Sequence, residues 1–303
     1  MGRPMMRGAA SLPGNQPLQG IFFIVVAVLC FSALDTATKL AAAVPVAMAL
    51  WVRYLFQTVV TGMALWPMRG SAFLKTRRPG LQFLRGLLLL ICSAIAFLSL
   101  RFMPVGEFTA IVMISPLVIT AISAWKLNDR VSALRWLCVV GGFAGSLAVI
   151  QPGGESFQWA MLLPCVLVLA NTAFQVLTSR LAKTDNSGTM HFYTGLVGLV
   201  LTSVALPFIW QAMPWTVWSL LLLIGALSTL GHFLLILAYA RAPIAVLTPY
   251  LYLQIGFSTL GGGLIFSHMP DAWALAGIAL VAASGALGTW LTAREQRGST
   301  SPL

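Results

Sequence analysis

Charged side chains are scarce in this sequence. Only 8% of its 303 residues are Asp, Glu, Lys or Arg, and just seven are acidic, whereas an ordinary soluble domain contains about 25% charged residues. So few charges cannot cover a surface that faces water. The net charge of +11 does not indicate a nucleic-acid partner, because the basic residues are dispersed among apolar runs and form no basic face with interleaved aromatics.

Motifs for covalent chemistry and for metal binding are also missing. The four cysteines share no CxxC or other ligand spacing, which argues against a disulfide scaffold and a zinc site. The histidines form no HExxH pattern, and neither G-x-S-x-G nor GxxxxGKS/T occurs. We therefore expect no catalytic residues, no metal and no cofactor, and the sequence does not support a hydrolase or an ATP-driven pump.

Long apolar runs dominate what is present. The mean hydropathy is +0.90, and each run is long enough to cross a hydrocarbon core, which takes about 17 to 25 helical residues. The runs are continuous rather than alternating, so transmembrane strands are not indicated. The sequence predicts an all-α integral membrane protein with ten transmembrane helices. Their expected ranges are 18–41, 45–66, 82–102, 105–126, 132–150, 157–180, 190–211, 215–240, 243–267 and 272–292.

The distribution of basic residues predicts an orientation. Of the 18 Lys and Arg residues, all but three fall on one side of these spans, including Arg85, which we assign to the connection between the second and third. Arg101 alone falls on the opposite side, and Lys39 and Arg53 lie within spans. Because cytoplasmic loops are enriched in Lys and Arg, we expect both termini to be cytoplasmic, in a bacterial inner (plasma) membrane.

A weak internal repeat appears when the chain is shifted by about 140 residues. Lys39-Leu40-Ala41 then matches Arg180-Leu181-Ala182, Gly86 matches Gly225, and Pro104 matches Pro243. A unit of five spans must insert its second copy upside down, which is a common construction in secondary transporters. The prediction is two inverted five-helix repeats around a central cavity. They cover 18–150 and 157–292, between cytoplasmic tails 1–17 and 293–303.

Two charged residues of the first span lie four positions apart. Asp35 and Lys39 therefore share a helix face and can neutralise each other. An ionisable residue inside a membrane span costs about 2.5 to 3.5 kcal/mol on insertion scales, so it needs a partner or a task. A structural ion pair and a substrate or proton role both remain open for this pair.

Two further charges lie near or within spans. Arg53 has no acidic neighbour in its own helix, and its planar fork suits a carboxylate or a phosphate, although it could also lie shallow and snorkel. Glu107 lies one turn into the fourth span, where the helix N-terminus favours a negative charge. If it faces the cavity instead, it is a possible proton site.

Polar side chains gather in the sixth and ninth spans. Asn171 and Gln175 share a face, as do Tyr250 and Gln254, and Tyr252 lies between the latter two. A cavity lined by amides and aromatics suits a planar or amphipathic solute, whereas hydrogen bonding between helices is the alternative for any one residue. Pro116 and Pro249 are candidate kinks beside the cavity.

Five segments carry a family resemblance. They are Phe31–Leu40 with Asp35 and Lys39, Arg53-Tyr54, Ser115-Pro116, Gly142–Gly153, and Pro249-Tyr250-Leu251-Tyr252. In their order and spacing on ten spans, they resemble the EamA-like family of the drug/metabolite transporter superfamily. The resemblance covers about residues 18 to 292. It implies two inverted five-helix repeats around a cavity, and export or exchange of small metabolites.

The leading hypothesis is a secondary transporter, working as an exporter or exchanger of small organic metabolites such as amino acids, nucleoside-like metabolites or drugs by alternating access. The expected substrate-binding residues are Asp35, Lys39, Arg53, Asn171, Gln175, Tyr250 and Tyr252. The expected partners are a small-molecule substrate and the lipid bilayer, and no nucleic acid is expected. We expect the protein to be a monomer or a homodimer. The alternatives are a membrane-embedded enzyme or assembly factor acting on lipid-linked substrates, and a passive channel.

Overall fold

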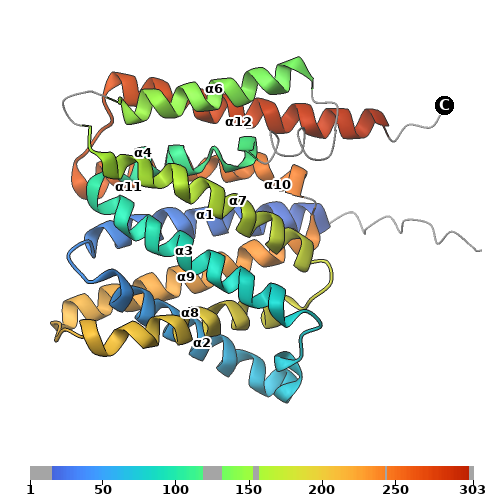
Figure 1. Ribbon diagram of the computed structural model, residues 1–303. Helices are drawn as coiled ribbons and strands as arrows, with labels where there is room; N and C mark the ends of the chain where they lie inside the picture. Colours follow the sequence, from blue (N-terminus) through green and yellow to red (C-terminus); the bar gives the residue numbers. More distant parts are fainter. Residues whose placement is uncertain (1–15, 119–131, 153–156, 243, 300–303) are drawn as a thin grey trace, which may run out of the picture.

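The computed structural model is a bundle of long helices that run side by side (Figure 1). It describes residues 16–118, 132–152, 157–242 and 244–299. Residues 119–126 of the fourth predicted span and most of the predicted N-terminal tail lie outside these ranges. The helices are α1 (Gln16–Leu40), α2 (Val46–Arg69), α3 (Pro79–Phe102), α4 (Val105–Val112), α6 (Ala133–Ile150), α7 (Leu163–Leu181), α8 (Ser187–Ile209), α9 (Trp215–Arg241), α10 (Ile244–Leu251), α11 (Leu253–Phe266) and α12 (Ala272–Ser299). Short 3-10 helices η1 (Gly70–Leu74) and η2 (Trp159–Leu162) precede α3 and α7.

Seven helical stretches in the described part of the chain are long and apolar enough to cross a membrane. Helices suit this environment because every backbone N–H and C=O must be satisfied within the segment when no water is available. The all-helical membrane prediction is therefore confirmed for the described residues. Two further apolar stretches, Val105–Val118 and Trp136–Ile150, are shorter, so the count of ten spans stays a prediction.

Two of the short helices are interrupted near prolines, at the places where kinks were predicted. The α4 helix ends at Val112, and a further helical turn follows a break at 113–114. Pro116 has no N–H for the carbonyl of Val112, and the hydroxyl of Ser115 donates to that oxygen instead, at 2.7 Å. In the second half, Pro249 lies within α10, and Tyr252 separates α10 from α11.

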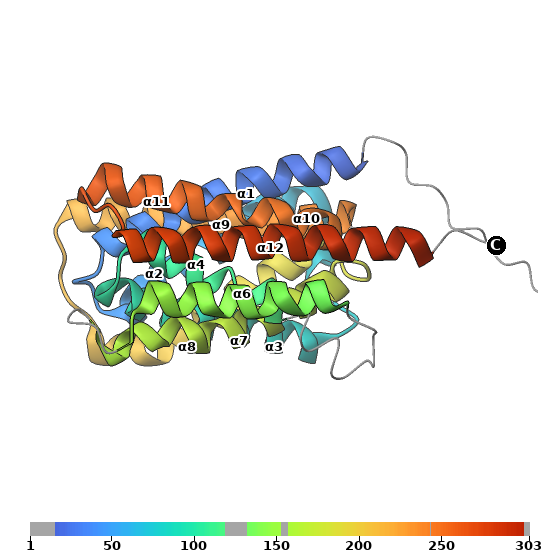
Figure 2. The same cartoon turned by 90° about the horizontal axis from the view of Figure 1, so that it is seen from above.

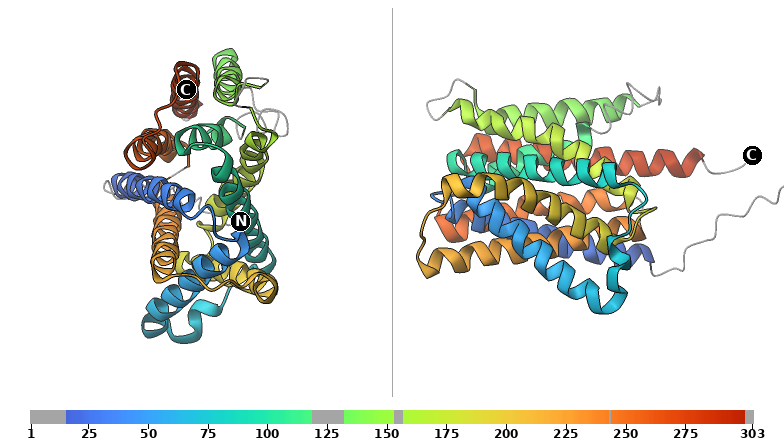
Figure 3. Two further views of the ribbon diagram at one scale, coloured as in Figure 1. Left: turned by 90° about the vertical axis from the view of Figure 1, so that its left-hand side faces the viewer. Right: turned by 60° about the horizontal axis from the view of Figure 1, so that its bottom comes forward.

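Helices far apart in the sequence form the main pairs. The α1 helix packs on α9, α3 on α7, α2 on α8, α4 on α11 and α6 on α12. Figure 2 shows α12 alongside α6, and the end-on view in Figure 3 shows the other helices grouped beside this pair. At their contact, Gly145 and Gly277 bring the two backbones so close that an added Cβ at Gly145 would lie 2.8 Å from the carbonyl oxygen of Gly277. Small residues thus permit close helix packing.

The two ends of the bundle differ in charge. The first described residues of α1 and the last turn of α12 lie at the same end (Figure 1). We call it the basic end, because it carries Arg69, Lys75, Arg77, Arg78, Arg180 and Lys183. The opposite end carries Lys39 and Arg101.

Arg85 corrects one step of the sequence analysis. We assigned it to a connection, yet it lies in the second turn of α3 and is only 1% exposed. The sequence analysis based the span on the apolar residues that follow Arg85, whereas α3 already begins at Pro79.

Candidate functional site

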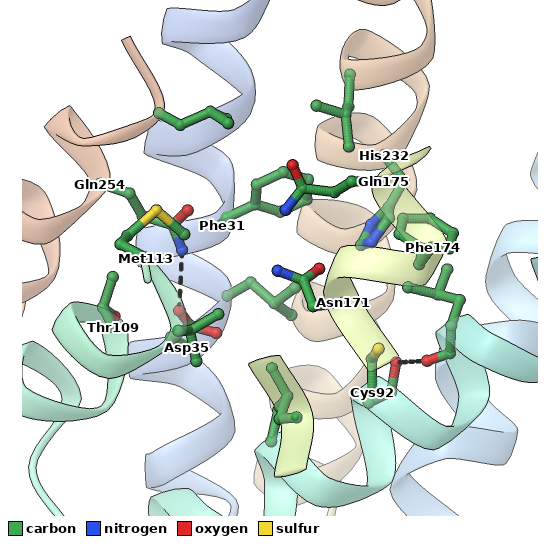
Figure 4. Close-up of a pocket in the computed structure, with 18 of the residues that line it drawn as sticks. Phe31, Asp35, Cys92, Thr109, Met113, Asn171, Phe174, Gln175, His232 and Gln254 are labelled. Carbon is green, nitrogen blue, oxygen red and sulfur yellow. Dashed lines mark hydrogen bonds between the residues drawn. The ribbon is translucent and has the colours of Figure 1, made fainter. Parts of the chain in front are cut away.

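A cavity of about 800 Å³ lies between the two halves of the chain (Figure 4). The helices α1, α2, α3, α4, α7, α9, α10 and α11 all contribute to its wall. The polar and aromatic residues considered below that line it are Phe31, Asp35, Arg53, Cys92, Ser93, Phe108, Asn171, Phe174, Gln175, His232, Tyr239 and Gln254. We call it the central cavity.

Asp35 lies on the α1 wall of the central cavity. Its Oδ2 accepts a hydrogen bond from Nε2 of Gln254 at 3.2 Å, which joins α1 to α11 (Figure 4). Among the described residues, no ion pair joins Asp35 to a cation. Its carboxylate is therefore held in place by a neutral amide while it faces the cavity.

Lys39 does not pair with Asp35, so the structural ion pair, one of the two alternatives left open for these residues, is not formed. Its Nζ donates to the carbonyl oxygens of Leu100 and Met103, at 3.1 and 2.8 Å. These carbonyls end α3, where the last turn has no N–H partners and the helix dipole favours a positive charge. Lys39 therefore lies outside the central cavity, at the opposite end of the bundle.

Arg53 lies deep in the bundle and does not snorkel, since it is only 7% exposed. Its Nε donates to the hydroxyl of Ser228 on α9 at 2.6 Å, and its guanidinium lies over the ring of Tyr54. In the described part of the chain, no carboxylate lies within ion-pair distance of it. Arg53 and Asp35 thus line the same cavity with opposite charges, and they do not contact each other.

Asn171 and Gln175 share the α7 wall of the cavity, as their spacing predicted (Figure 4). The Nδ2 of Asn171 donates to the hydroxyl of Ser115 at 3.1 Å. The hydroxyl of Tyr239 donates to Oε1 of Gln175 at 3.2 Å. These bonds connect α7 to the interrupted fourth span on one side and to α9 on the other.

Tyr250 and Tyr252 are not among the described residues that line the cavity. From this segment, Leu251 and Gln254 line the cavity instead, on either side of the break between α10 and α11. Tyr252 is buried against α12, where Gly285 leaves space for its ring. The prediction grouped these two tyrosines with the cavity by their spacing from Gln254.

The aromatic part of the wall was missed by the sequence analysis. His232 lines the cavity, contacts the carbonyl oxygen of Ser228 through Nδ1 at 2.9 Å, and packs edge-on against Phe31 and Phe174. Phe108 of α4 completes this set. The histidine was considered only as a metal ligand, and the described residues hold no group of three or more His, Cys, Asp or Glu that could bind a metal ion.

Glu107 lies away from the central cavity, at the opposite end of the bundle. It is 6% exposed, and its Oε1 lies 3.0 Å from Nε2 of His268, in the connection between α11 and α12. Next to this pair, a second cavity of about 530 Å³ is lined by residues that include Lys39, Arg101 and His268. The first-turn position of Glu107 in α4 is as predicted, whereas its contact with His268 could not be read from the sequence.

Comparison with known proteins shows a likeness to one family of transporters. The profile of the EamA-like transporter family matches residues 18–151. The first half of this chain is therefore similar to the EamA-like transporter family. A riboflavin transporter of Vibrio cholerae is 28% identical over 294 residues, covering 93% of this chain and 97% of the relative. An S-adenosylmethionine uptake transporter of Rickettsia bellii is 26% identical over 229 residues, covering 76% and 78%.

A solved crystal structure supports the fold independently. It aligns with a TM-score of 0.64 at 18% identity, and covers 91% of this chain and 98% of its own. At that identity, the likeness concerns the fold alone. The family profile and the names of the relatives point to an integral membrane transporter of small molecules rather than to an enzyme.

Proposed function

We propose that this EamA-like protein is a secondary transporter that moves a small organic metabolite by alternating access through the central cavity. The observation that carries the proposal is the placement of Asp35 and Arg53. Two opposite charges line one cavity without pairing, although mutual neutralisation would lower the cost of burying each of them. A substrate that contacts both charges accounts for this arrangement.

Two inverted halves, 18–150 and 157–292, form part of the proposal. Exchanging them turns α1 into α7, α2 into α8, α3 into α9, α4 into α10 and α11, and α6 into α12. The observed contacts fit this exchange, because α1 packs on α9 as α7 packs on α3, and α2 on α9 as α8 on α3. The pairs α2–α8, α4–α11 and α6–α12 each join equivalent helices. This pattern is the one that a pseudo-two-fold axis between two inverted halves would give.

Two close contacts support the same exchange at the level of side chains. A Cβ added to Gly86 of α3 would lie 2.6 Å from Cβ of Val197 on α8. A Cβ added to Gly225 of α9 would lie 2.9 Å from Cβ of Phe56 on α2. Gly86 and Gly225 are about 140 residues apart, and so are Phe56 and Val197. The Gly86–Val197 and Gly225–Phe56 contacts therefore correspond to each other when the two halves are exchanged.

The interrupted fourth and ninth spans suit a transport site. Discontinuous helices at corresponding positions of two repeats often surround the substrate in secondary transporters. Here the break in α4 supplies Ser115, which binds Asn171, and the break before α11 precedes Gln254, which binds Asp35. Both breaks therefore support polar side chains of the central cavity.

The lining favours a substrate class. Asp35 can accept from a cationic or donor group, Arg53 can bind an anionic or acceptor group, and Phe31, Phe108 and Phe174 can pack against a planar ring. We infer a heteroaromatic metabolite with a polar chain. Riboflavin and S-adenosylmethionine, which the relatives' names mention, both have that form, and the latter also carries both charges.

We also propose that the basic end is cytoplasmic. The excess of Lys and Arg there follows the distribution found in short cytoplasmic loops. Both termini are then cytoplasmic, and the Glu107–His268 contact lies on the outer side. The relatives named above are bacterial, which supports the inner membrane as the location.

Uptake into proteoliposomes tests the site. We expect Arg53→Ala to reduce uptake of radiolabelled S-adenosylmethionine or riboflavin at least tenfold, because it removes the donor fork from the cavity. The variant Arg101→Ala, outside the central cavity, is the control and should retain most of its uptake. Unchanged uptake by Arg53→Ala would remove Arg53 from the site. Acceleration of uptake by preloaded unlabelled substrate distinguishes a carrier from a passive channel.

The native Cys92 provides a test that needs no known substrate. It lines the central cavity, and changing Cys30, Cys138 and Cys165 to Ser leaves it as the only thiol. In vesicles of each orientation, we expect a membrane-impermeant thiol reagent to label Cys92 from both sides, with the two rates changing in opposite directions when the Glu107–His268 contact is removed. Labelling from one side only, in every variant, would contradict alternating access.

A further inference from the structure

An apolar groove lies on the outside of the bundle near the basic end. It runs between α2, η1 and α8, has a volume of about 900 Å³, and is lined entirely by apolar residues that include Met63, Trp66, Leu74 and Phe192. Met63 and Trp66 are 72% and 61% exposed. The groove thus joins helices of both proposed halves, and its wall faces outward where a membrane protein meets lipid.

The wall of the groove is fixed by packing and by one hydrogen bond. Phe73 of η1 is 3% exposed and packs edge-on against Trp66 of α2 and Phe192 of α8, with ring centroids 6.4 and 5.0 Å away. The hydroxyl of Tyr193 donates to the carbonyl oxygen of Leu74 at 2.7 Å. The 3-10 helix is therefore attached to both neighbours, and the groove exists before anything enters it.

Four cations lie close in sequence to the segments that form this groove. Arg69 ends α2, Lys75 directly follows η1, and Arg77 and Arg78 directly precede α3; all four are exposed. Within the described ranges, none of their side chains forms a hydrogen bond or an ion pair.

The nearby carboxylate does not neutralise these cations. Oδ2 of Asp185 accepts from the hydroxyl of Thr76 at 3.0 Å and from Nε2 of Gln82 at 2.7 Å. Its hydrogen bonds are thus made to neutral groups, and the four cations remain available to an anion from outside the protein.

We propose that this groove binds an anionic phospholipid, with one acyl chain against Trp66 and Phe192 and with the phosphate among Arg69, Lys75, Arg77 and Arg78. An acyl chain matches the apolar lining, and cations beside a membrane surface attract anionic headgroups. Free phosphate has no apolar part that could occupy the groove. A second copy of the chain would need carboxylates at its interface to pair with the four cations.

The corresponding connection of the other half has neither part of this site. Between α8 and α9, residues 210–214 read Trp-Gln-Ala-Met-Pro, with no basic residue and no 3-10 helix. The lipid site therefore belongs to one end of the bundle and to one leaflet. Because α2 and α8 come from different halves, the bound lipid contacts both sides of the seam between them.

Native mass spectrometry of the purified, delipidated protein tests the proposal. Phosphatidylglycerol and phosphatidylcholine with identical acyl chains are the probes. We expect the first phosphatidylglycerol to bind at least tenfold more tightly than phosphatidylcholine. The change Arg77→Gln with Arg78→Gln should remove most of this preference. The matched change Arg180→Gln with Lys183→Gln, which removes two exposed charges from the same end, should keep it.

A second variant separates the groove from the charges. A Cβ at Gly62 would have only ordinary van der Waals contact with Phe192, at 3.5 Å. We therefore expect Gly62→Leu to fold, to fill part of the groove and to weaken the binding of both lipids alike. Equal affinity of the wild type for the two lipids would overturn the proposal. It would also fail if the two charge-pair variants behaved identically, if glycerophosphate competed as well as the lipid, or if the wild type were a dimer that excluded lipid. None of these outcomes depends on the transport proposal.

Discussion

Arg53 and Arg85 are two buried arginines of the first half with different surroundings. Each reaches a hydroxyl on the second half, Ser228 in one case and Thr178 in the other. Arg53 faces the central cavity, whereas Arg85 lies nearer the basic end behind Phe174, whose ring it contacts. One residue type thus serves two purposes, and its surroundings decide which.

The hydrogen bonds of the two residues show the difference. The Nε of Arg85 donates to Thr178 at 2.9 Å, and its Nη1 donates to the carbonyl oxygen of Met190 at 3.0 Å and to the hydroxyl of Thr194. These acceptors lie on α7 and α8 and hold α3 against both. Arg53 has one such bond, so most of its fork remains for a ligand. We infer that Arg85 joins the halves and that Arg53 binds substrate.

The largest effect on stability should come from Arg85→Ala. It removes three hydrogen bonds of a charged group and leaves a cavity, which we expect to cost about 3 kcal/mol, compared with about 1 kcal/mol for the single bond lost in Arg53→Ala. The apparent melting temperature in detergent measures both. Equal losses would mean that the two arginines do not differ in the way described.

The next largest effect concerns the charge opposite Arg53. Asp35→Asn keeps an acceptor for Gln254 but removes the negative charge, so we expect binding of cationic S-adenosylmethionine to weaken about tenfold, or about 1.4 kcal/mol. Neutral riboflavin should be affected much less. Titration calorimetry with both compounds checks this, and Asp271→Asn, outside the cavity, is the matched control. A similar loss for both compounds would contradict a direct charge contact.

A smaller effect is expected at the opposite end of the bundle. His268→Ala leaves the buried carboxylate of Glu107 without its imidazole, which we expect to cost about 1 kcal/mol. Glu107→Gln can still bind His268 and should cost less. Melting temperatures of the two variants, measured in parallel, decide the order. The reverse order would show that the charge of Glu107, and not its hydrogen bond, holds this end together.

The smallest effect should come from Asp271, in the connection before α12. The backbone N–H of Ala274 and the amide of Gln151 hold the pKa of the Asp271 carboxyl below its usual value of 3.8. A lowered pKa contributes stability above pH 3.8, and this contribution is lost as the pH falls through the folded-state value. Asp271→Ala should therefore lower the melting temperature slightly at pH 7, and the difference should shrink toward pH 3. A difference independent of pH would contradict this account.

Much of the fold follows from local features of the sequence. The apolar runs predict the membrane helices, Pro116 and Pro249 predict the interruptions, and the spacing of Asn171 and Gln175 predicts their shared wall. These features depend on neighbours within a few turns. The same spacing rule failed for Tyr250, because it tells which residues share a face and not which face the neighbouring helices leave open to the cavity.

Other features depend on contacts between distant parts of the chain. Lys39 donates to carbonyl oxygens more than 60 residues away in the sequence instead of pairing with Asp35. Glu107 contacts His268, which is 161 residues away in the sequence. The sequence around Arg85 suggests an exposed residue of a connection, whereas in the structure α7 and α8 bury it. No spacing rule reaches across such separations.

The sequence by itself indicated that this protein lies in a membrane, that its spans are helical, and that the basic residues gather at one end. These follow from composition and from the hydrogen-bonding needs of a backbone in lipid. Only the tertiary structure decided which polar groups face one another, leaving Asp35 and Arg53 unpaired in a cavity and enclosing Arg85. Lipid offers a polar side chain no hydrogen bonds, so its partner depends on which helix is packed against it.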